Sequence, residues 1–262
     1  MSEVSKQNYL QVVSYLAPNW FDFYQAVVAY LSRVLGIETQ LHQGEYDPLE
    51  DPLLLQDQLD LAFICGLPLI RRWQLAPKLQ PLVAPVMISA RYQQRPIYYS
   101  DVIVNANSDL VKFEDLAGKT FCYNDLGSNS GYNLLRYKLI QSGYSQSFFG
   151  ETIQSGSHQN SIRWVVDGIA DCAAIDSVVL EQERNNFPEL SQQLRVVEAL
   201  GPSPAPPLAY SWHLDKSLVE QIRLALLHPD TQLQAAMDKY RVKSFATVEL
   251  EDYFGLARMY HY

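Results

Sequence analysis

The chain has 262 residues, of which 48% are hydrophobic and 19% are charged, so it can bury a substantial core in one large or two smaller domains. Its net charge of −9 argues against a nucleic-acid-binding surface, which needs clustered Lys and Arg. No apolar run is long enough to span a membrane, and Met1 to Lys6 lacks the basic-then-apolar order of a secretory signal.

The first hundred residues alternate between strand and helix patterns. Residues 9–16 read as a strand, residues 20–35 as an amphipathic helix and residues 37–43 as a second strand, which gives a β-α-β opening. A helix is expected over residues 48–58. It leads into the apolar run of residues 59–66, which is typical of a parallel strand buried on both faces.

Gly66 ends that apolar run, and Gly66-Leu67-Pro68 predicts a loop at the carboxyl end of the strand. Open α/β sheets bind their ligands at such ends, so Gly66 is a candidate ligand contact. A strand at residues 82–89 follows, and then a long extended segment at residues 96–105. A strand of that length can cross from one lobe to another.

The pattern then restarts as a second α/β unit. Its expected elements are a short helix at 113–118, a strand at 119–123, a helix at 129–142, a strand at 151–154, a helix at 158–167, a strand at 172–175 and a helix from residue 176. Four prolines within residues 201–207 mark a second crossing.

After this crossing, a strand at 208–212 and helices at 215–227 and 230–240 are expected to pack back on the first lobe. The sequence therefore predicts a first lobe of residues 1–100 that is completed by residues 204–262. The second lobe is predicted to comprise residues 101–203.

The three cysteines, Cys65, Cys122 and Cys172, lie far apart in apolar runs, so we expect buried thiols rather than metal ligands or a nucleophile. No cofactor, no metal site and no catalytic residue is predicted, because neither a Walker glycine loop nor a nucleophile elbow is present.

The most informative segment of the chain runs from Asn124 to Tyr132. In it Ser128, Asn129 and Ser130 stand where a strand should end and a helix should start. The first N–H groups of a helix lack internal acceptors, and small polar side chains beside them form an anion-binding turn without Lys or Arg. Gly156-Ser157-His158 repeats this pattern at the next helix. The alternative is ordinary helix capping.

With these residues, the chain resembles the phosphate, phosphite and phosphonate-binding family, the substrate-binding components of ABC transporters. The resemblance extends over about residues 40 to 230. It is carried by Leu59-Asp60-Leu61-Ala62-Phe63, Tyr98-Tyr99-Ser100, Leu116-Ala117-Gly118-Lys119, Ser128-Asn129-Ser130-Gly131 and Gly156-Ser157-His158, followed by Asp167-Gly168-Ile169-Ala170-Asp171. It implies an α/β, two-lobed type II periplasmic-binding-protein fold with mixed sheets flanked by helices and two hinge crossings.

The resemblance also implies the ligand contacts. Ser128, Asn129 and Ser130 match the Ser-Thr-Ser turn that holds phosphonate or phosphate oxygens, with an amide in place of the middle hydroxyl. His158, Tyr98 and Tyr46 match further ligand contacts. Members that hold aminoalkyl phosphonates have an acidic residue where Val178 stands by ungapped counting. Asp176 lies two residues earlier and is either that acid or a helix cap.

The function implied is capture of a phosphorus oxyanion between two lobes, without catalysis, with an ABC permease as the partner. Three expectations stay open at this point. One alternative is a cytosolic enzyme of the same fold that acts on a small carboxylate or phosphate, of the menaquinone or thiamine precursor type, and another is a ligand sensor. The family implies the periplasm or cell envelope, while the absence of a signal in this sequence leaves the cytoplasm open.

Overall fold

The computed structural model describes residues 9–75, 78–145 and 147–257, so the amino-terminal stretch considered as a signal lies outside this description. The chain forms two compact units. Unit 1 contains residues 1–96 and 205–254, and unit 2 contains residues 97–204 and 255–262. We refer to the steps Pro96–Ile97 and Pro204–Ala205 as the two crossings.

Unit 1 is built on a six-stranded mixed sheet in the order β11-β4-β10-β3-β1-β2. Its strands are β1 (Tyr9–Ser14), β2 (Glu38–Gln43), β3 (Leu61–Phe63), β4 (Leu79–Met87), β10 (Leu208–Ser211) and β11 (Val242–Thr247). β1 pairs in parallel with β2 and β3, whereas β10 pairs antiparallel with β3 and β4. The inner strands are almost entirely buried, because helices cover both faces of the sheet.

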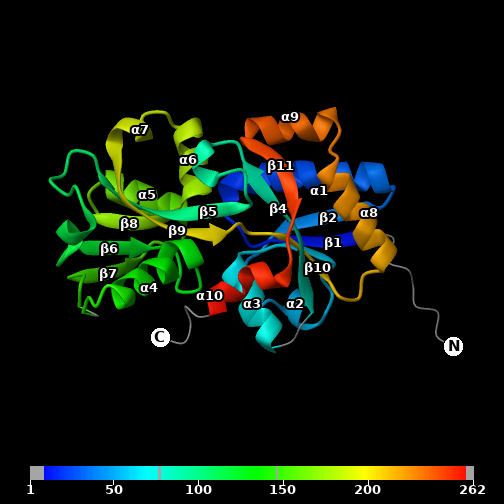
Figure 1. The fold of residues 1–262 in the computed structure, drawn as a ribbon, viewed down its shortest axis with the longest axis horizontal. Helices are drawn as coiled ribbons and strands as arrows, with labels where there is room; N and C mark the ends of the chain where they lie inside the picture. The colour runs from blue at the N-terminus through cyan, green and yellow to red at the C-terminus, as the bar shows by residue number, and fades with distance from the viewer. Residues whose placement is uncertain (1–8, 76–77, 146, 258–262) are drawn as a thin grey trace. The chain divides into compact units, whose positions relative to one another are not determined.

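The helices of unit 1 form two layers (Figure 1). One layer contains α1 (Phe21–Leu35), α8 (Lys216–Leu227) and α9 (Thr231–Lys239), which contact one another through α1. The other contains α2 (Pro52–Leu55) and α3 (Gly66–Leu75). The remaining short helices of unit 1 are η1 (Pro18–Trp20), η2 (Ala90–Tyr92) and η5 (Leu250–Tyr253), and α10 (Phe254–Ala257) starts at the last residue of unit 1 and continues into unit 2.

Unit 2 is built on a five-stranded sheet in the order β7-β6-β8-β5-β9. Its strands are β5 (Ile97–Asn105), β6 (Thr120–Tyr123), β7 (Glu151–Gln154), β8 (Cys172–Asp176) and β9 (Leu194–Pro204). β6 pairs in parallel with β7 and β8, and β5 pairs antiparallel with β8 and β9. Four strands therefore run in one direction and β5 runs against them.

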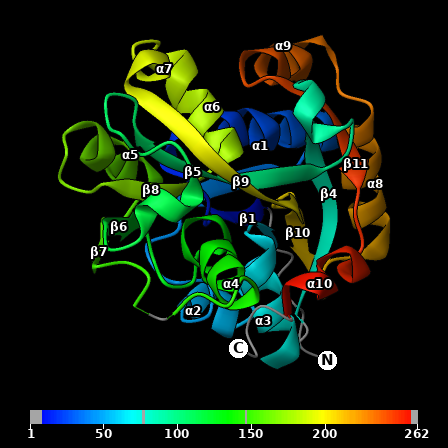
Figure 2. The ribbon, with the colours of Figure 1, turned by 60° about the vertical axis from the view of Figure 1, so that its left-hand side comes forward.

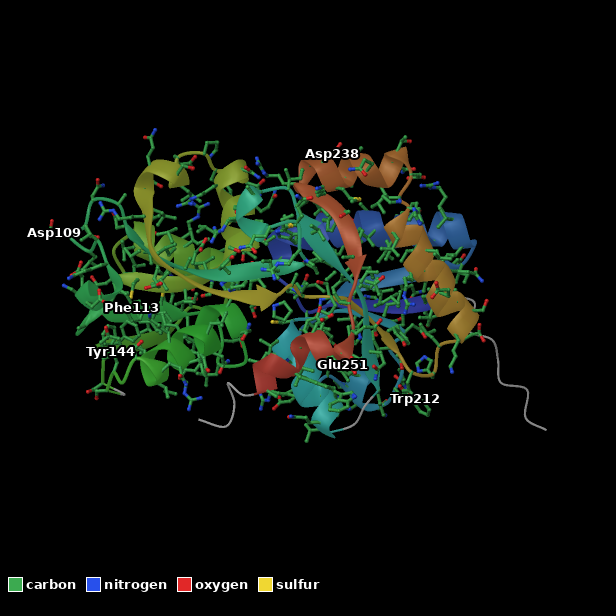
Figure 3. All side chains as sticks on the ribbon, viewed as in Figure 1. Asp109, Phe113, Tyr144, Trp212, Asp238 and Glu251 are labelled. Carbon is green, nitrogen blue, oxygen red and sulfur yellow. The ribbon has the colours of Figure 1, made fainter. Side chains whose placement is uncertain are left out.

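Two buried clusters fix the helices of unit 2 to opposite faces of this sheet (Figure 2). The helices are η3 (Phe113–Leu116), the π-helical turn η4 (Asn129–Asn133), α4 (Leu134–Gln141), α5 (His158–Val166), α6 (Ser177–Asn186) and α7 (Leu190–Gln193). Aromatic rings dominate the α4 face, where the rings of Phe113 and Tyr144 have centroids 6.0 Å apart (Figure 3). Ile162, Val165 and Leu180 fill the α5 and α6 face.

The structure corrects the predicted helix at residues 48–58 and the predicted loop at Gly66. Only Pro52–Leu55 is helical, because the Asp51 side chain accepts a hydrogen bond from the Leu53 N–H and starts the helix late. Gly66 is the first residue of α3 rather than part of a loop. Pro68 is tolerated there because the first turn of a helix has no intrahelical acceptor for its N–H groups.

Two further differences concern the ends of the sheets. The boundary expected at residue 100 falls inside β5, which pairs with β9 from Ile97 onward, so the crossing precedes Ile97. Residues 201–204, which belong to the proline-rich stretch expected to mark the second crossing, are the end of β9. β9 is an edge strand, and an edge strand tolerates proline because one side of it has no pairing partner.

Each of the three cysteines is a thiol outside any disulfide, with Cys122 and Cys172 buried and Cys65 partly exposed. Across the described ranges, no group of three or more His, Cys, Asp or Glu side chains is placed to hold a metal ion. In the same ranges, no helix has both the length and the apolar character that a membrane crossing requires.

Candidate anion-binding site

Polar side chains gather at one edge of the unit 2 sheet. The strand directions bring the carboxyl ends of β6, β7, β8 and β9 to this edge together with the start of β5. Residues 128–130 follow β6, residues 155–158 follow β7, and Tyr98, Asp176 and Ser203 lie at the ends of β5, β8 and β9. Carboxyl ends of strands are where α/β sheets bind ligands. We call this edge the polar edge of unit 2.

Ser128 caps the helical segment that begins at Asn129. Its Oγ accepts a hydrogen bond of 3.0 Å from the Gly131 N–H, as expected of a serine N-cap. A hydroxyl that accepts one hydrogen bond still has its own proton to donate. Capping therefore leaves Ser128 able to donate to an anion beside the first N–H groups of the helix.

Gly131 allows this turn to pack against the loop after β6. A Cβ at Gly131 would overlap the Oδ1 of Asn124 and would lie 3.1 Å from the Oγ of Ser128. The Asn124 carbonyl in turn accepts a hydrogen bond of 3.1 Å from the Gly156 N–H. The two loops that carry the candidate site are thus tied together at Asn124, and a Cβ at position 131 would require the Asn124 side chain to move.

His158 is the first residue of α5 and contacts Ser130. Its Nε2 lies 3.1 Å from the Ser130 Oγ, and the imidazole is buried. Burial lowers the pKa of His158 to about 4, so the ring is neutral at physiological pH. Nδ1 is buried, and the described residues offer it no hydrogen-bond partner.

That environment assigns the tautomer of His158. A buried N–H without an acceptor is rarer and more costly than an acceptor without a donor, so the proton belongs on Nε2. Nε2–H then donates to the Ser130 Oγ. The Ser130 hydroxyl, which accepts from His158, is left with its own proton for an anion.

Asn129 is fully buried and engages both ends of the β5–β9 pair. Its Nδ2 donates to the Tyr98 Oη at 2.6 Å and to the Ser203 Oγ at 3.1 Å. An amide NH₂ has two hydrogens, so both have acceptors within unit 2. A further bond of 2.6 Å runs from the Ser100 Oγ to the Ser130 carbonyl. Sequence reasoning did not single out Ser203 or the Ser100 hydroxyl.

Asp176 lies at the end of β8, opposite Ser100 on β5, and caps α6. Its Oδ1 accepts from the N–H groups of Val178 at 2.8 Å and Val179 at 3.4 Å. Burial raises the pKa of Asp176 to about 7, the two backbone hydrogen bonds oppose this shift, and the charges of Asp101 and Glu181 add to it. Val178 contributes a backbone N–H to this cap.

The structure brings six of the eight predicted ligand residues to the polar edge of unit 2: Tyr98, Ser128, Asn129, Ser130, His158 and Asp176. Tyr46 and Gly66 belong to unit 1. Tyr46 follows β2 and is 58% exposed, whereas Gly66 is buried at the start of α3.

Two mixed sheets flanked by helices, with polar helix starts at the carboxyl edge of the second sheet, form the fold of the type II periplasmic-binding-protein class. The comparison with known families identifies the group within this class. Residues 12–253 match the family described as ABC transporter, phosphonate, periplasmic substrate-binding protein. The chain belongs to this family.

Solved structures share the fold at low sequence identity. PhnD1 from Prochlorococcus marinus, solved with methylphosphonate, is 18% identical with a TM-score of 0.84, covering 96% of this chain and 97% of that one. A binding protein component of an ABC phosphonate transporter from Pseudomonas aeruginosa is 16% identical with a TM-score of 0.83, covering 97% and 85%. A mutant of ArgBP from T. maritima is 18% identical with a TM-score of 0.61, covering 91% and 97%.

Family membership confirms the resemblance found in the sequence and the predicted fold class. It also favours a binding protein over the enzyme of the same fold, since the family consists of substrate-binding proteins. Such a protein is a component of an ABC transporter, so its partner is a permease. The family description places its members in the periplasm.

Proposed function

We propose that this protein binds a phosphorus oxyanion, a phosphonate, phosphite or phosphate, at the polar edge of unit 2 and supplies it to an ABC permease from the periplasm. The family membership supports the transport role. The methylphosphonate in the P. marinus structure supports the ligand class.

The observation that carries this proposal is the contact between Ser130 and His158. It joins the first turns of two helices, so the positive ends of both helices and several hydroxyl donors face the same edge. With its proton on Nε2, His158 leaves the Ser130 hydroxyl free to donate. An anion bound here accepts hydrogen bonds from the loop after β6 and from the loop after β7.

The hydrogen-bond donors at this site are neutral, and four or five of them are sufficient to bind an anion with micromolar affinity. Residues 124–132 and 155–160 contain no Lys or Arg. Each hydrogen bond to a charged group contributes about 1.5–3 kcal/mol. Four or five such bonds give micromolar affinity, about −8 kcal/mol, after association costs of several kcal/mol. Neutral donors favour a compact tetrahedral anion that accepts several hydrogen bonds at once.

Asp176 favours a second candidate, an aminoalkyl phosphonate such as 2-aminoethylphosphonate. Both of its capping bonds use Oδ1, so the cap leaves Oδ2 for a ligand ammonium. An ammonium beside this carboxylate would lower its pKa from about 7 and favour the ionised form. Asp176 is then a contact for the amine, and the Ser128–Ser130 turn holds the phosphonate.

We also propose Tyr46 and Gly66, which belong to unit 1, as ligand contacts. Tyr46 presents an exposed ring and hydroxyl after β2, and Gly66 offers a backbone N–H at the start of α3. Tyr46→Phe keeps the ring and removes the hydroxyl, so a loss of affinity in this variant would assign a hydrogen bond to the ligand.

A thermal-shift panel tests the proposal. Purified protein is heated with phosphate, phosphite, methylphosphonate, 2-aminoethylphosphonate, sulfate and small carboxylates at equal concentrations. A ligand present at a hundred times its Kd stabilises the folded state by about 2.7 kcal/mol, which is a shift of several degrees. We expect this shift with a phosphorus oxyanion. A shift with carboxylates alone would overturn the proposal.

A further inference from the structure

We propose that Asn129 is a positioning residue that ties the anion-binding turn to the chain at both crossings, rather than a hydrogen-bond donor to the ligand. This inference rests on the proposed function and deepens it. It assigns to the middle residue of the turn a role different from that of its two serine neighbours.

The geometry places Asn129 between the two strand ends nearest the crossings. Tyr98 is the second residue after the crossing into unit 2, and Ser203 is the second residue before the crossing back. The two residues are direct partners in the β5–β9 pair. The single side-chain amide of Asn129 donates to both, at 2.6 Å and 3.1 Å.

Burial makes these hydrogen bonds costly to break. Asn129, Tyr98 and Ser203 are 0%, 1% and 2% exposed, so water cannot replace a lost partner. A buried polar group that loses its partner incurs its full desolvation penalty. The turn and the two strand ends therefore move as one body.

A second tie runs parallel to the first. The Ser100 Oγ donates to the Ser130 carbonyl at 2.6 Å, so the residue after Asn129 is also held to β5. Ser130 is the residue that we expect to donate to the anion. A shift of Ser130 on anion binding is thereby transmitted to β5, and through Asn129 to β9.

The amide chemistry explains why asparagine suits this role. Its NH₂ group has two hydrogens and serves two acceptors, whereas a threonine hydroxyl at the same position has only one. Threonine can donate to only one of Tyr98 and Ser203, and its side chain is shorter than that of asparagine. The Asn129 side chain thus joins three segments that are distant in sequence.

Hydrogen exchange and calorimetry test this role. Amide exchange is followed by mass spectrometry over residues 97–105 and 194–204, with and without phosphate, phosphite or methylphosphonate, and the Kd is measured by titration. The proteins are the wild type, Asn129→Thr, Ser203→Ala, the double variant and Ser108→Ala. Ser108 is the matched control, because its Oγ donates to the Asn105 carbonyl in unit 2 outside the polar edge.

We expect the anion to slow exchange in both segments of the wild type and of Ser108→Ala. Ser203→Ala should lose most of this protection and bind about three- to tenfold more weakly. Because the two residues form one interaction, Ser203→Ala should have little further effect on the Asn129→Thr background.

The contrary outcomes separate the two proposals. If the wild type binds none of the three anions, the proposed function fails and this coupling fails with it. If the wild type binds but Ser203→Ala matches Ser108→Ala in affinity and exchange, only the role of Asn129 is overturned. Additive effects of Asn129→Thr and Ser203→Ala on affinity would also overturn this role. If Asn129→Thr fails to fold, Ser203→Ala alone still tests the role of Asn129.

Discussion

The Oγ of Ser130 lies 3.1 Å from the Nε2 of His158, and this contact joins the first turns of two helices that start 29 positions apart, at Asn129 and His158. The imidazole is neutral because burial lowers its pKa to about 4. The proposed anion site therefore depends on the direction of a hydrogen bond rather than on a positive charge.

Replacing His158 tests that dependence. His158→Ala removes the donor to the Ser130 Oγ, so we expect the affinity for methylphosphonate to fall roughly tenfold or more. His158→Gln retains an N–H near the position of Nε2 and should recover part of the loss. Isothermal titration at pH 7.5 measures both. Equal losses in the two variants would show that the donor direction is unimportant.

The low pKa of His158 also predicts how stability depends on pH. The unfolded chain takes up a proton near pH 6.5, whereas the folded protein takes it up near pH 4. The contribution of His158 is therefore fully present above pH 6.5 and is lost as the pH falls toward 4, by up to about 3 kcal/mol. Urea unfolding between pH 4.5 and 7.5 measures this slope, which should be shallower in His158→Gln. An unchanged slope would contradict the assignment.

Asp176 predicts the opposite trend. The folded protein keeps the proton on this carboxyl up to about pH 7, while the unfolded chain loses it near 3.8. Stability from this group is thus greatest below pH 3.8 and falls as the pH rises to 7. Asp176→Asn preserves the cap and removes the charge, so it should be more stable than the wild type at pH 8 in urea unfolding.

The same variant separates the two candidate ligands. If Asp176 pairs with a ligand ammonium, Asp176→Asn should weaken binding of 2-aminoethylphosphonate and leave methylphosphonate unchanged. If Asp176→Asn binds each ligand with the same affinity as the wild type does, Asp176 only caps α6.

Gly131→Ala should destabilise the protein. Its Cβ would overlap the Asn124 Oδ1, and overpacking of this kind costs about 1–3 kcal/mol. Gly255→Ala is the matched control, because a Cβ there meets nothing within 4 Å. Urea midpoints compare the two. Adding Asn124→Ala should restore part of the stability of Gly131→Ala, and an absence of any rescue would point to a different source of strain.

The sequence was sufficient for the strand and helix order around the site because these elements follow simple periodicities and clear caps. Ser157 and Asp215 cap α5 and α8 where small polar residues precede the apolar spacing. The turn at residues 128–130 could be proposed as an anion site because hydroxyl and amide residues stand together at a strand–helix junction.

The sequence did not predict the environment of Asn129. Its partners Tyr98 and Ser203 are 31 and 74 residues away, and Ser203 lies in a proline-rich stretch that local rules describe as a break. Strand pairing across such distances depends on tertiary contacts rather than local propensity. Knowing that Tyr98 pairs with Ser203 would have identified the environment of Asn129, but no pattern in the neighbouring sequence indicates that strand register.

The most direct test of the site is a calorimetric titration of methylphosphonate into the wild type, Ser130→Ala and Ser108→Ala. We expect binding to the wild type and to Ser108→Ala with the same Kd, and binding to Ser130→Ala that is at least about tenfold weaker. Equal affinity of Ser130→Ala and the wild type would contradict the claim that the anion is held at the polar edge of unit 2.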